Sequence, residues 1–117
     1  MTKRADKDLL NAVLEPRKPG ALQKIDSACA AGADPNAAWF DSAWDNARET
    51  PVYGAAGVAN DCELAAMLLD AGADPNDGET PYHFVEHDGA PCAEVLWPHL
   101  DETSRTTALL HKLDYPD

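Results

Sequence analysis

The sequence predicts an all-α fold in which short helix-turn-helix units stack side by side, and two recurring motifs carry this prediction. The hexapeptide Ala-Gly-Ala-Asp-Pro-Asn occurs at residues 31–36 and again at 71–76, a shift of 40 residues. Glu-Thr-Pro occurs at 49–51 and again at 79–81, a shift of 30 residues. Because the two shifts differ, we infer one repeated unit whose connecting loop varies in length.

Each motif has a physical role at a helix end. Thr followed by Pro favours a helix start, with the hydroxyl at the N-cap and the fixed φ of proline at the first helical position. Ala-Gly after an apolar run favours a helix stop, because glycine adopts the left-handed conformation there. Asp-Pro then prevents the helix from continuing. Each unit is therefore expected to run through helix, turn, helix and loop.

The second unit shows this pattern most completely. We expect a first helix from Thr50 to about Val58, a turn at 59–61 and a second helix from Cys62 to Ala71. The second helix is apolar almost all round, which a lone surface helix would not be. It therefore requires neighbours on two sides, as a stack of units provides.

These motifs resemble the ankyrin repeat, whose unit begins with a Thr-Pro-Leu-His-like helix and ends in Leu-Leu-x-x-Gly-Ala-Asp-x-Asn. Residues 80–83 (Thr-Pro-Tyr-His) and 68–76 match this pattern, and residues 50–53 match with Tyr53 in place of histidine. The resemblance covers about Asp8 to Leu113. It implies an ankyrin-repeat solenoid with loop fingers, whose fingers and first helices form a concave face for non-covalent protein binding.

We expect a single domain over residues 1–117 that is divided by the repeats. Residues 8–36 form a capping repeat without Thr-Pro, 37–76 a repeat with a long finger, and 77–104 a degenerate repeat whose second helix is broken by Pro98. Residues 105–117 form either a partial repeat of a longer array or a C-terminal cap. We expect a helix to begin at Thr107, with three leucines covering the end of the stack: Leu109, Leu110 and Leu113.

Charge limits the classes of partner. The chain holds 9 Lys and Arg against 21 Asp and Glu, a formal net charge of −12. Residues 1–24 carry six cations and three anions, whereas residues 25–117 carry three cations and 18 anions. Nucleic-acid binding requires clustered cations, so this balance excludes it as an electrostatic function, and it also disfavours an anionic membrane surface. A protein partner with a basic patch fits best.

The three cysteines are expected to be thiols in the core. Their count is odd and no Cys-x-x-Cys pair occurs, which disfavours a disulfide scaffold or a zinc knuckle and favours the cytoplasm. Cys62 and Cys92 each follow the threonine of their unit by 12 residues, and Cys29 aligns with Leu69. These are positions where the repeat places core residues. No apolar run is long enough for a membrane helix.

One segment has the form of a zinc-hydrolase motif. His83, Glu86 and His87 form His-x-x-Glu-His, in which one helical face could chelate zinc and the glutamate could act as a base. However, His83 occupies the Thr-Pro-x-His position, which the resemblance assigns to structural bonding between loops. Ser27 and Ser104 lie in no nucleophile motif. We therefore expect no catalytic residue, metal or cofactor.

The finger between Asn36 and Thr50 is the strongest candidate for a functional surface. It holds two of the three tryptophans, interleaved with acids, and large aromatic side chains make binding hot spots. The same rings could instead pack internally. Trp97 is expected to be structural. The residues expected to contact a partner are Trp39, Phe40, Asp41, Trp44, Asp45, Tyr53, Asp77, Glu79 and Tyr82.

The sequence thus predicts a monomeric, non-catalytic protein-protein interaction module. Three alternatives stay open at this point. The first is an immunity or inhibitor protein that neutralises a toxin or enzyme, and the second is a structural piece of a longer array. The third is a zinc-dependent hydrolase built on the histidine motif.

Overall fold

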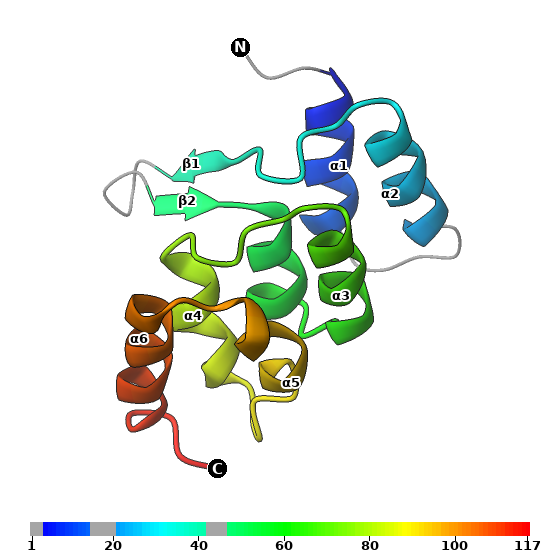
Figure 1. Ribbon diagram of the computed structural model, residues 1–117. Helices are drawn as coiled ribbons and strands as arrows, with labels where there is room; N and C mark the ends of the chain where they lie inside the picture. Colours follow the sequence, from blue (N-terminus) through cyan, green and yellow to red (C-terminus); the bar gives the residue numbers. More distant parts are fainter. Residues whose placement is uncertain (1–3, 15–20, 42–46) are drawn as a thin grey trace.

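The computed structural model describes residues 4–14, 21–41 and 47–117, and this part of the chain is mostly helical, as predicted (Figure 1). One short antiparallel hairpin interrupts the helices, with Trp39 opposite Glu49. The elements, in chain order, are α1 (Arg4–Leu14), α2 (Ala21–Ala30), β1 (Trp39–Asp41), β2 (Ala47–Glu49), η2 (Tyr53–Val58), α3 (Cys62–Asp70), α4 (Glu79–His83), η3 (Phe84–Glu86), α5 (Ala93–Leu96), η4 (Trp97–His99) and α6 (Glu102–Lys112). Of the elements labelled η, η2 is a π-helical turn and η3 and η4 are 3₁₀ turns.

The helices form two rows. Along the first row α1 contacts η2, η2 contacts α4, and α4 contacts α6. In the second row α2 lies against α1, α3 lies against η2, and α5 contacts α3 (Figure 1). The hairpin extends from the first row, where β2 contacts α4. Apolar side chains from both rows form one continuous core that includes Leu9, Ile25, Val52, Leu68, Phe84 and Leu96.

The two hexapeptides form matching turns, as predicted. Gly32 and Gly72 adopt φ values of +90° and +102°, a conformation that favours glycine. After each glycine, an alanine N–H donates back to the helix, from Ala33 to the Ala28 carbonyl at 3.0 Å and from Ala73 to the Leu68 carbonyl at 2.9 Å. The expected helix stop at Ala-Gly is therefore confirmed in both copies.

An asparagine side chain joins each turn to the next one along the stack. The Asn36 Oδ1 accepts from the Asp74 N–H at 2.6 Å, and its Nδ2 donates to the Gly72 carbonyl at 3.1 Å. The Asn76 Oδ1 accepts from the Asp101 N–H at 2.8 Å, and its Nδ2 donates to the His99 carbonyl at 3.0 Å. The same pair of bonds thus occurs twice, although the turn at 99–101 lacks the hexapeptide.

The helix starts agree with the prediction in the second unit but not in the third. The Thr50 Oγ1 accepts from the Tyr53 N–H at 3.2 Å and caps the first helix, and Asp61 caps α3 by accepting from the Leu64 N–H. The expected N-cap at Thr80 is wrong. The Asp77 Oδ1 accepts from the Glu79 and Thr80 N–H groups, so α4 begins one residue before Thr80.

The last helix begins earlier than predicted. Asp101 caps it by accepting from the Ser104 N–H at 2.8 Å, so α6 starts at Glu102 rather than Thr107, and the expected boundary at 104/105 falls inside it. This start turns Ser104, Ala108 and His111 inward. The prediction that the leucines cover the stack is wrong, because Leu109, Leu110 and Leu113 are 61%, 63% and 76% exposed on the outer face.

The cysteine prediction is also corrected. Cys62 and Cys92 form a disulfide with their Cα atoms 5.1 Å apart. Equivalent positions in successive units are neighbours in a stack, so the shared register brings the two sulfurs together. Cys29 is half-buried against the core. Among the described residues, no helix has the length and hydrophobicity needed to cross a membrane.

Candidate functional site

The site candidate is a line of ring and carboxylate side chains along the first row of helices. We call Glu79, His83, Glu86 and His111 the histidine–glutamate row. Tyr53 from η2 begins the line: its ring centroid lies 5.5 Å from that of His83. Both residues follow a Thr-Pro by the same spacing, so the stack makes them neighbours. Gly57 leaves room for this contact, since a Cβ there would come within 2.8 Å of the Tyr53 ring.

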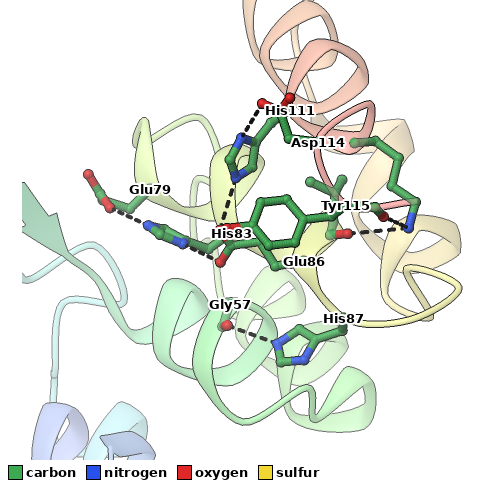
Figure 2. Close-up of polar contacts among 10 residues, drawn as sticks. Gly57, Glu79, His83, Glu86, His87, His111, Asp114 and Tyr115 are labelled. Atoms are coloured by element: carbon green, nitrogen blue, oxygen red, sulfur yellow. Dashed lines mark hydrogen bonds and ion pairs between the residues drawn. The ribbon is translucent and has the colours of Figure 1, made fainter. Parts of the chain in front are cut away.

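His83 lies between two carboxylates. Its Nδ1 is 2.7 Å from the Glu86 Oε1, and its Nε2 is 3.1 Å from the Glu79 Oε2 (Figure 2). A neutral imidazole has only one N–H, so it can donate to one carboxylate only. The two contacts are both hydrogen bonds when the ring is an imidazolium.

His111 brings α6 into the same line. It is buried, and its Nε2 lies 2.9 Å from the second oxygen of Glu86, the Oε2 (Figure 2). Its Nδ1 is 3.9 Å from the Asp114 Oδ2. The ring stacks on Tyr82, with centroids 3.6 Å apart and planes 20° apart, and the centroid of the Tyr115 ring lies 4.9 Å from that of His111.

Glu86 is the centre of the row, and its surroundings change its acidity. Burial alone would raise the pKa of Glu86, but hydrogen bonds from His111 and His83 and the charges of these rings outweigh it and lower the pKa. The negative charge of Glu86 in turn raises the pKa of the Tyr115 phenol. Glu86 is therefore held as a carboxylate that both histidines share.

Asp77 forms a second polar centre beside the row. Its Oδ2 accepts from the Thr50 hydroxyl at 2.5 Å and from the Thr80 hydroxyl at 2.8 Å. Its Oδ1 accepts from the Glu79 and Thr80 N–H groups at 3.0 and 2.6 Å. Burial raises the pKa of Asp77 in spite of these four bonds. This side chain ties the two Thr-Pro helices together.

The structure brings together some of the residues expected to contact a partner. Tyr53, Glu79 and Tyr82 gather around His83. Asp77 is bonded to the Glu79 backbone and to Thr50 and Thr80, as described above. Trp39, Phe40 and Asp41 are in β1, but their side chains lie outside the described part, and Trp44 and Asp45 lie outside the described residues altogether. The finger hypothesis therefore stays a prediction.

Trp97 has the structural role expected of it. It is half-buried against the core, and the Arg105 guanidinium carbon lies 5.2 Å from its ring centroid. The Arg105 Nη2 also donates to the Trp97 carbonyl at 2.9 Å. Trp97 thus connects η4 to α6.

The histidine motif does not lie on one helical face. α4 ends at His83, a 3₁₀ turn follows, and His87 has extended backbone with ψ of 136°. The His87 Nε2 is 2.9 Å from the Gly57 carbonyl oxygen, while His83 turns to Glu79 and Glu86 (Figure 2). Among the described residues, no group of three or more His, Cys, Asp or Glu side chains is placed to hold a metal ion.

Sequence reasoning missed His111, because its place depends on where α6 begins. With a helix starting at Thr107, the face of the helix that carries His111 could not be assigned to the core or to solvent. The capping residue Asp101 fixes the start of α6, and His111 then lies on its buried face. Asp-x-x-Ser at 101–104 was the available signal for that start. No family model matches the chain, and no curated protein matches it.

Proposed function

We propose that this chain is an ankyrin-type protein-binding module that performs no chemical step. Three features support a repeat solenoid of that type: the paired left-handed turns, the repeated asparagine bonds between them, and the two Thr-Pro helices that share Asp77. In such a stack each unit contacts its neighbours and one extended face is left to vary. Recognition of a partner by that face is the activity the arrangement favours.

One observation carries the binding proposal: Tyr82 is 43% exposed and stands between His83 and His111 at the surface of α4. Tyrosine combines a large, rigid contact area with a polar tip, which makes it a frequent anchor of interfaces. Because β2 contacts α4, this surface continues toward the hairpin that carries Trp39 and Phe40. We call the surface of η2, α4 and the hairpin the binding face.

Charge favours a partner with a basic patch. The net charge of −12 would speed the approach of such a partner and repel acidic competitors. Affinity should then fall as salt rises, because exposed charges are screened over about 10 Å at 0.1 M ionic strength. The same net charge opposes self-association, in agreement with a monomer.

The odd cysteine count favours the cytoplasm, whereas the Cys62–Cys92 disulfide favours an oxidising compartment, so the two observations call for a test. Disulfides persist in oxidising compartments and are rare in the cytosol. Alkylation of thiols in intact native cells, followed by mass analysis, would show whether Cys62 and Cys92 are reduced there. Two alkylated residues would support the cytoplasm, and an intact disulfide would contradict it.

A comparison of bait variants tests the binding face. The full chain and a Tyr82→Ala/Glu79→Gln variant would each be used to capture proteins from native cells. The matched control is Asp70→Asn, which removes one negative charge from an exposed position at the end of α3, in the other row of helices. We expect the partner bound by the wild type and the control to be lost by the double variant. Equal capture by all three would contradict this face, and Trp39→Ala with Trp44→Ala would then test the finger.

A further inference from the structure

We infer that Glu86 and the two histidines bound to it form a proton-dependent clasp, which holds α6 on α4 and η3 at mildly acidic pH and loosens it as pH rises. The three side chains come from α4, η3 and α6, in the last third of the chain, and α5 and η4 separate η3 from α6 in the sequence. Glu86 uses one oxygen for each histidine, at 2.7 Å and 2.9 Å. The clasp therefore spans the contact between the last helix and the rest of the stack.

Both contacts of His83 are hydrogen bonds only when each ring nitrogen carries a proton. Its two nitrogens face different carboxylates, at 2.7 Å and 3.1 Å. If the ring loses one proton, one nitrogen directs a lone pair at a carboxylate oxygen, and an attractive contact becomes repulsive. Charge-assisted hydrogen bonds of this kind are roughly twice as strong as neutral ones, so the loss of one proton changes the contact substantially.

His111 adds a second group of the same kind, in a more buried position. Its Nε2 faces Glu86 and its Nδ1 faces Asp114, so both nitrogens again face carboxylates. The ring lies flat on Tyr82, and an aromatic face attracts a cation placed over it. Protonated His111 thus gains from both carboxylates and from the tyrosine ring, while neutral His111 keeps only the donor to Glu86.

The charge balance of the cluster gives the direction of the effect. Glu79, Glu86 and Asp114 contribute three negative charges close to two imidazoles. With both rings protonated the cluster has one net negative charge, and with both neutral it has three. Like charges at these separations repel in a partly buried setting. His111 lies in the last turn of α6 and Asp114 follows its C-cap, whereas Glu79 and Glu86 lie in α4 and η3. This repulsion therefore acts between the C-terminal end of α6 and those two elements.

The other charged and titratable groups around the clasp do not replace the imidazole protons. Tyr115 lies against His111 and makes a hydrogen bond with Glu86, and Tyr53 approaches His83 from η2. The Lys112 ammonium is 2.6 Å from the Asp117 carboxylate and donates to two backbone carbonyls. β2 contributes Glu49, and also Arg48, whose side chain lies outside the described part. Lys112 donates to the Val85 carbonyl and Asp117 accepts from the Gly89 N–H, and neither bond depends on the histidines. These bonds keep the C-terminal residues in place when the clasp opens, so α6 loosens without detaching.

The sign of the pH dependence follows from both ends of the clasp. Each imidazolium directs a donor at both of the carboxylates that its ring faces, so these contacts are complete when the rings are protonated and lose a donor when a ring gives up a proton. The pKa of Glu86 is lowered, so its contribution is present above the unfolded value and is lost as pH falls through the folded value. The clasp is therefore tightest at mildly acidic pH.

Hydrogen exchange of the α6 amides tests this inference on the full chain with its disulfide intact. After correction for the intrinsic pH dependence of exchange, we expect the opening equilibrium of α6 to increase about tenfold between about pH 6 and pH 8, which is within the limit of tenfold per pH unit that one linked proton sets. The α3 amides provide the internal reference. In His83→Asn/His111→Gln, which keeps one neutral donor to each Glu86 oxygen, this increase should disappear.

Two further measurements keep the outcome decisive. His99→Gln alters an exposed histidine outside the clasp and should retain the wild-type pH dependence. If the double variant does not fold, Glu79→Gln and Asp114→Asn, which remove exposed or half-buried carboxylates from the cluster, should each reduce the increase. The inference is wrong if wild-type α6 opens equally at both pH values, or if the double variant keeps the full pH dependence.

Discussion

The two junctions of the stack are held in different ways. The first, between the unit of α1 and α2 and the unit of η2 and α3, is crossed by apolar packing and by the two bonds of Asn36. The second, between the unit of η2 and α3 and the unit of α4 and α5, is crossed by the two bonds of Asn76. It has four further ties: the Cys62–Cys92 disulfide, the Asp77 bond to Thr50, the His87 bond to Gly57 and the Tyr53–His83 ring contact.

The difference follows the lengths of the helices. α1 and α2 have 11 and 10 residues and can bury long apolar side chains such as Leu9 and Ile25. α4 and α5 have five and four residues and continue as the 3₁₀ turns η3 and η4, and Pro98 in η4 prevents α5 from continuing as an α-helix. The third unit nevertheless contributes Phe84, Val85 and Leu96 to the buried core. The second junction therefore adds polar and covalent ties to its apolar packing, whereas the first has the packing and the Asn36 bonds.

The largest expected effect comes from the core that both junctions share. Leu68 in α3 is fully buried, and Leu68→Ala should lower the free energy of unfolding by about 2–5 kcal/mol, through lost transfer energy and the cavity left behind. Urea unfolding followed by circular dichroism measures this. The matched control, Leu110→Ala, removes the same atoms from an exposed site on α6 and should change the value by less than about 0.5 kcal/mol. Equal losses would mean that α6 packs differently.

Breaking the disulfide should weaken the second junction alone. The crosslink joins two residues with a sequence separation of 30. Removing a disulfide that closes a loop of such length lowers the free energy of unfolding by about 2–4 kcal/mol. Urea unfolding of the wild type with and without a reducing agent measures the loss. Cys62→Ala/Cys92→Ala should match the reduced wild type and should not respond to the reductant. If the reduced and oxidised wild type have the same free energy of unfolding, the disulfide does not stabilise the second junction.

Much of the fold follows from local signals in the sequence. The turns at Gly32 and Gly72 and the start of α3 were predicted because each is decided by nearby residues. The disulfide was missed although its signal was present. Cys62 and Cys92 share a register, and that register was interpreted as burial, when equal positions in neighbouring units also mean contact. Contacts between units join residues far apart in the sequence. They can be predicted only by superposing neighbouring units and asking which equivalent positions touch.

The site was predicted less well, for a related physical reason. Tyr53, Glu79 and Tyr82 were found because they belong to the Thr-Pro helices. The pairing of Glu86 with His111 joins residues 25 positions apart and depends on the rotation of α6 about its axis. That rotation is set by one capping bond, from the Ser104 N–H to Asp101. Without it, Leu109 and His111 are equally plausible as the inward residue.

The asparagine pair provides the finest test of the two junctions, because each side chain makes the same two bonds across its junction. The Asn76 Nδ2 also donates to the Asp74 Oδ1 at 2.8 Å, within its own turn. A net hydrogen bond contributes about 0.5–1.5 kcal/mol, so Asn36→Ala should lower the free energy of unfolding by about 1–3 kcal/mol. Asn76→Ala should cost less, about 1 kcal/mol, because the other ties of the second junction hold the turn near its place. Urea unfolding of the oxidised protein compares the two variants, with exposed Asn11→Ala on α1 as the control.

The comparison becomes sharper when the second junction loses its crosslink. In a background of Cys62→Ala/Cys92→Ala, the effect of Asn76→Ala should rise toward that of Asn36→Ala, because the turn then depends more on its own two bonds. The effect of Asn36→Ala should stay the same, since sites without shared partners are nearly additive. If Asn76→Ala costs the same in both backgrounds, the turn at Asn76 is independent of the disulfide, and the ties of the second junction act separately.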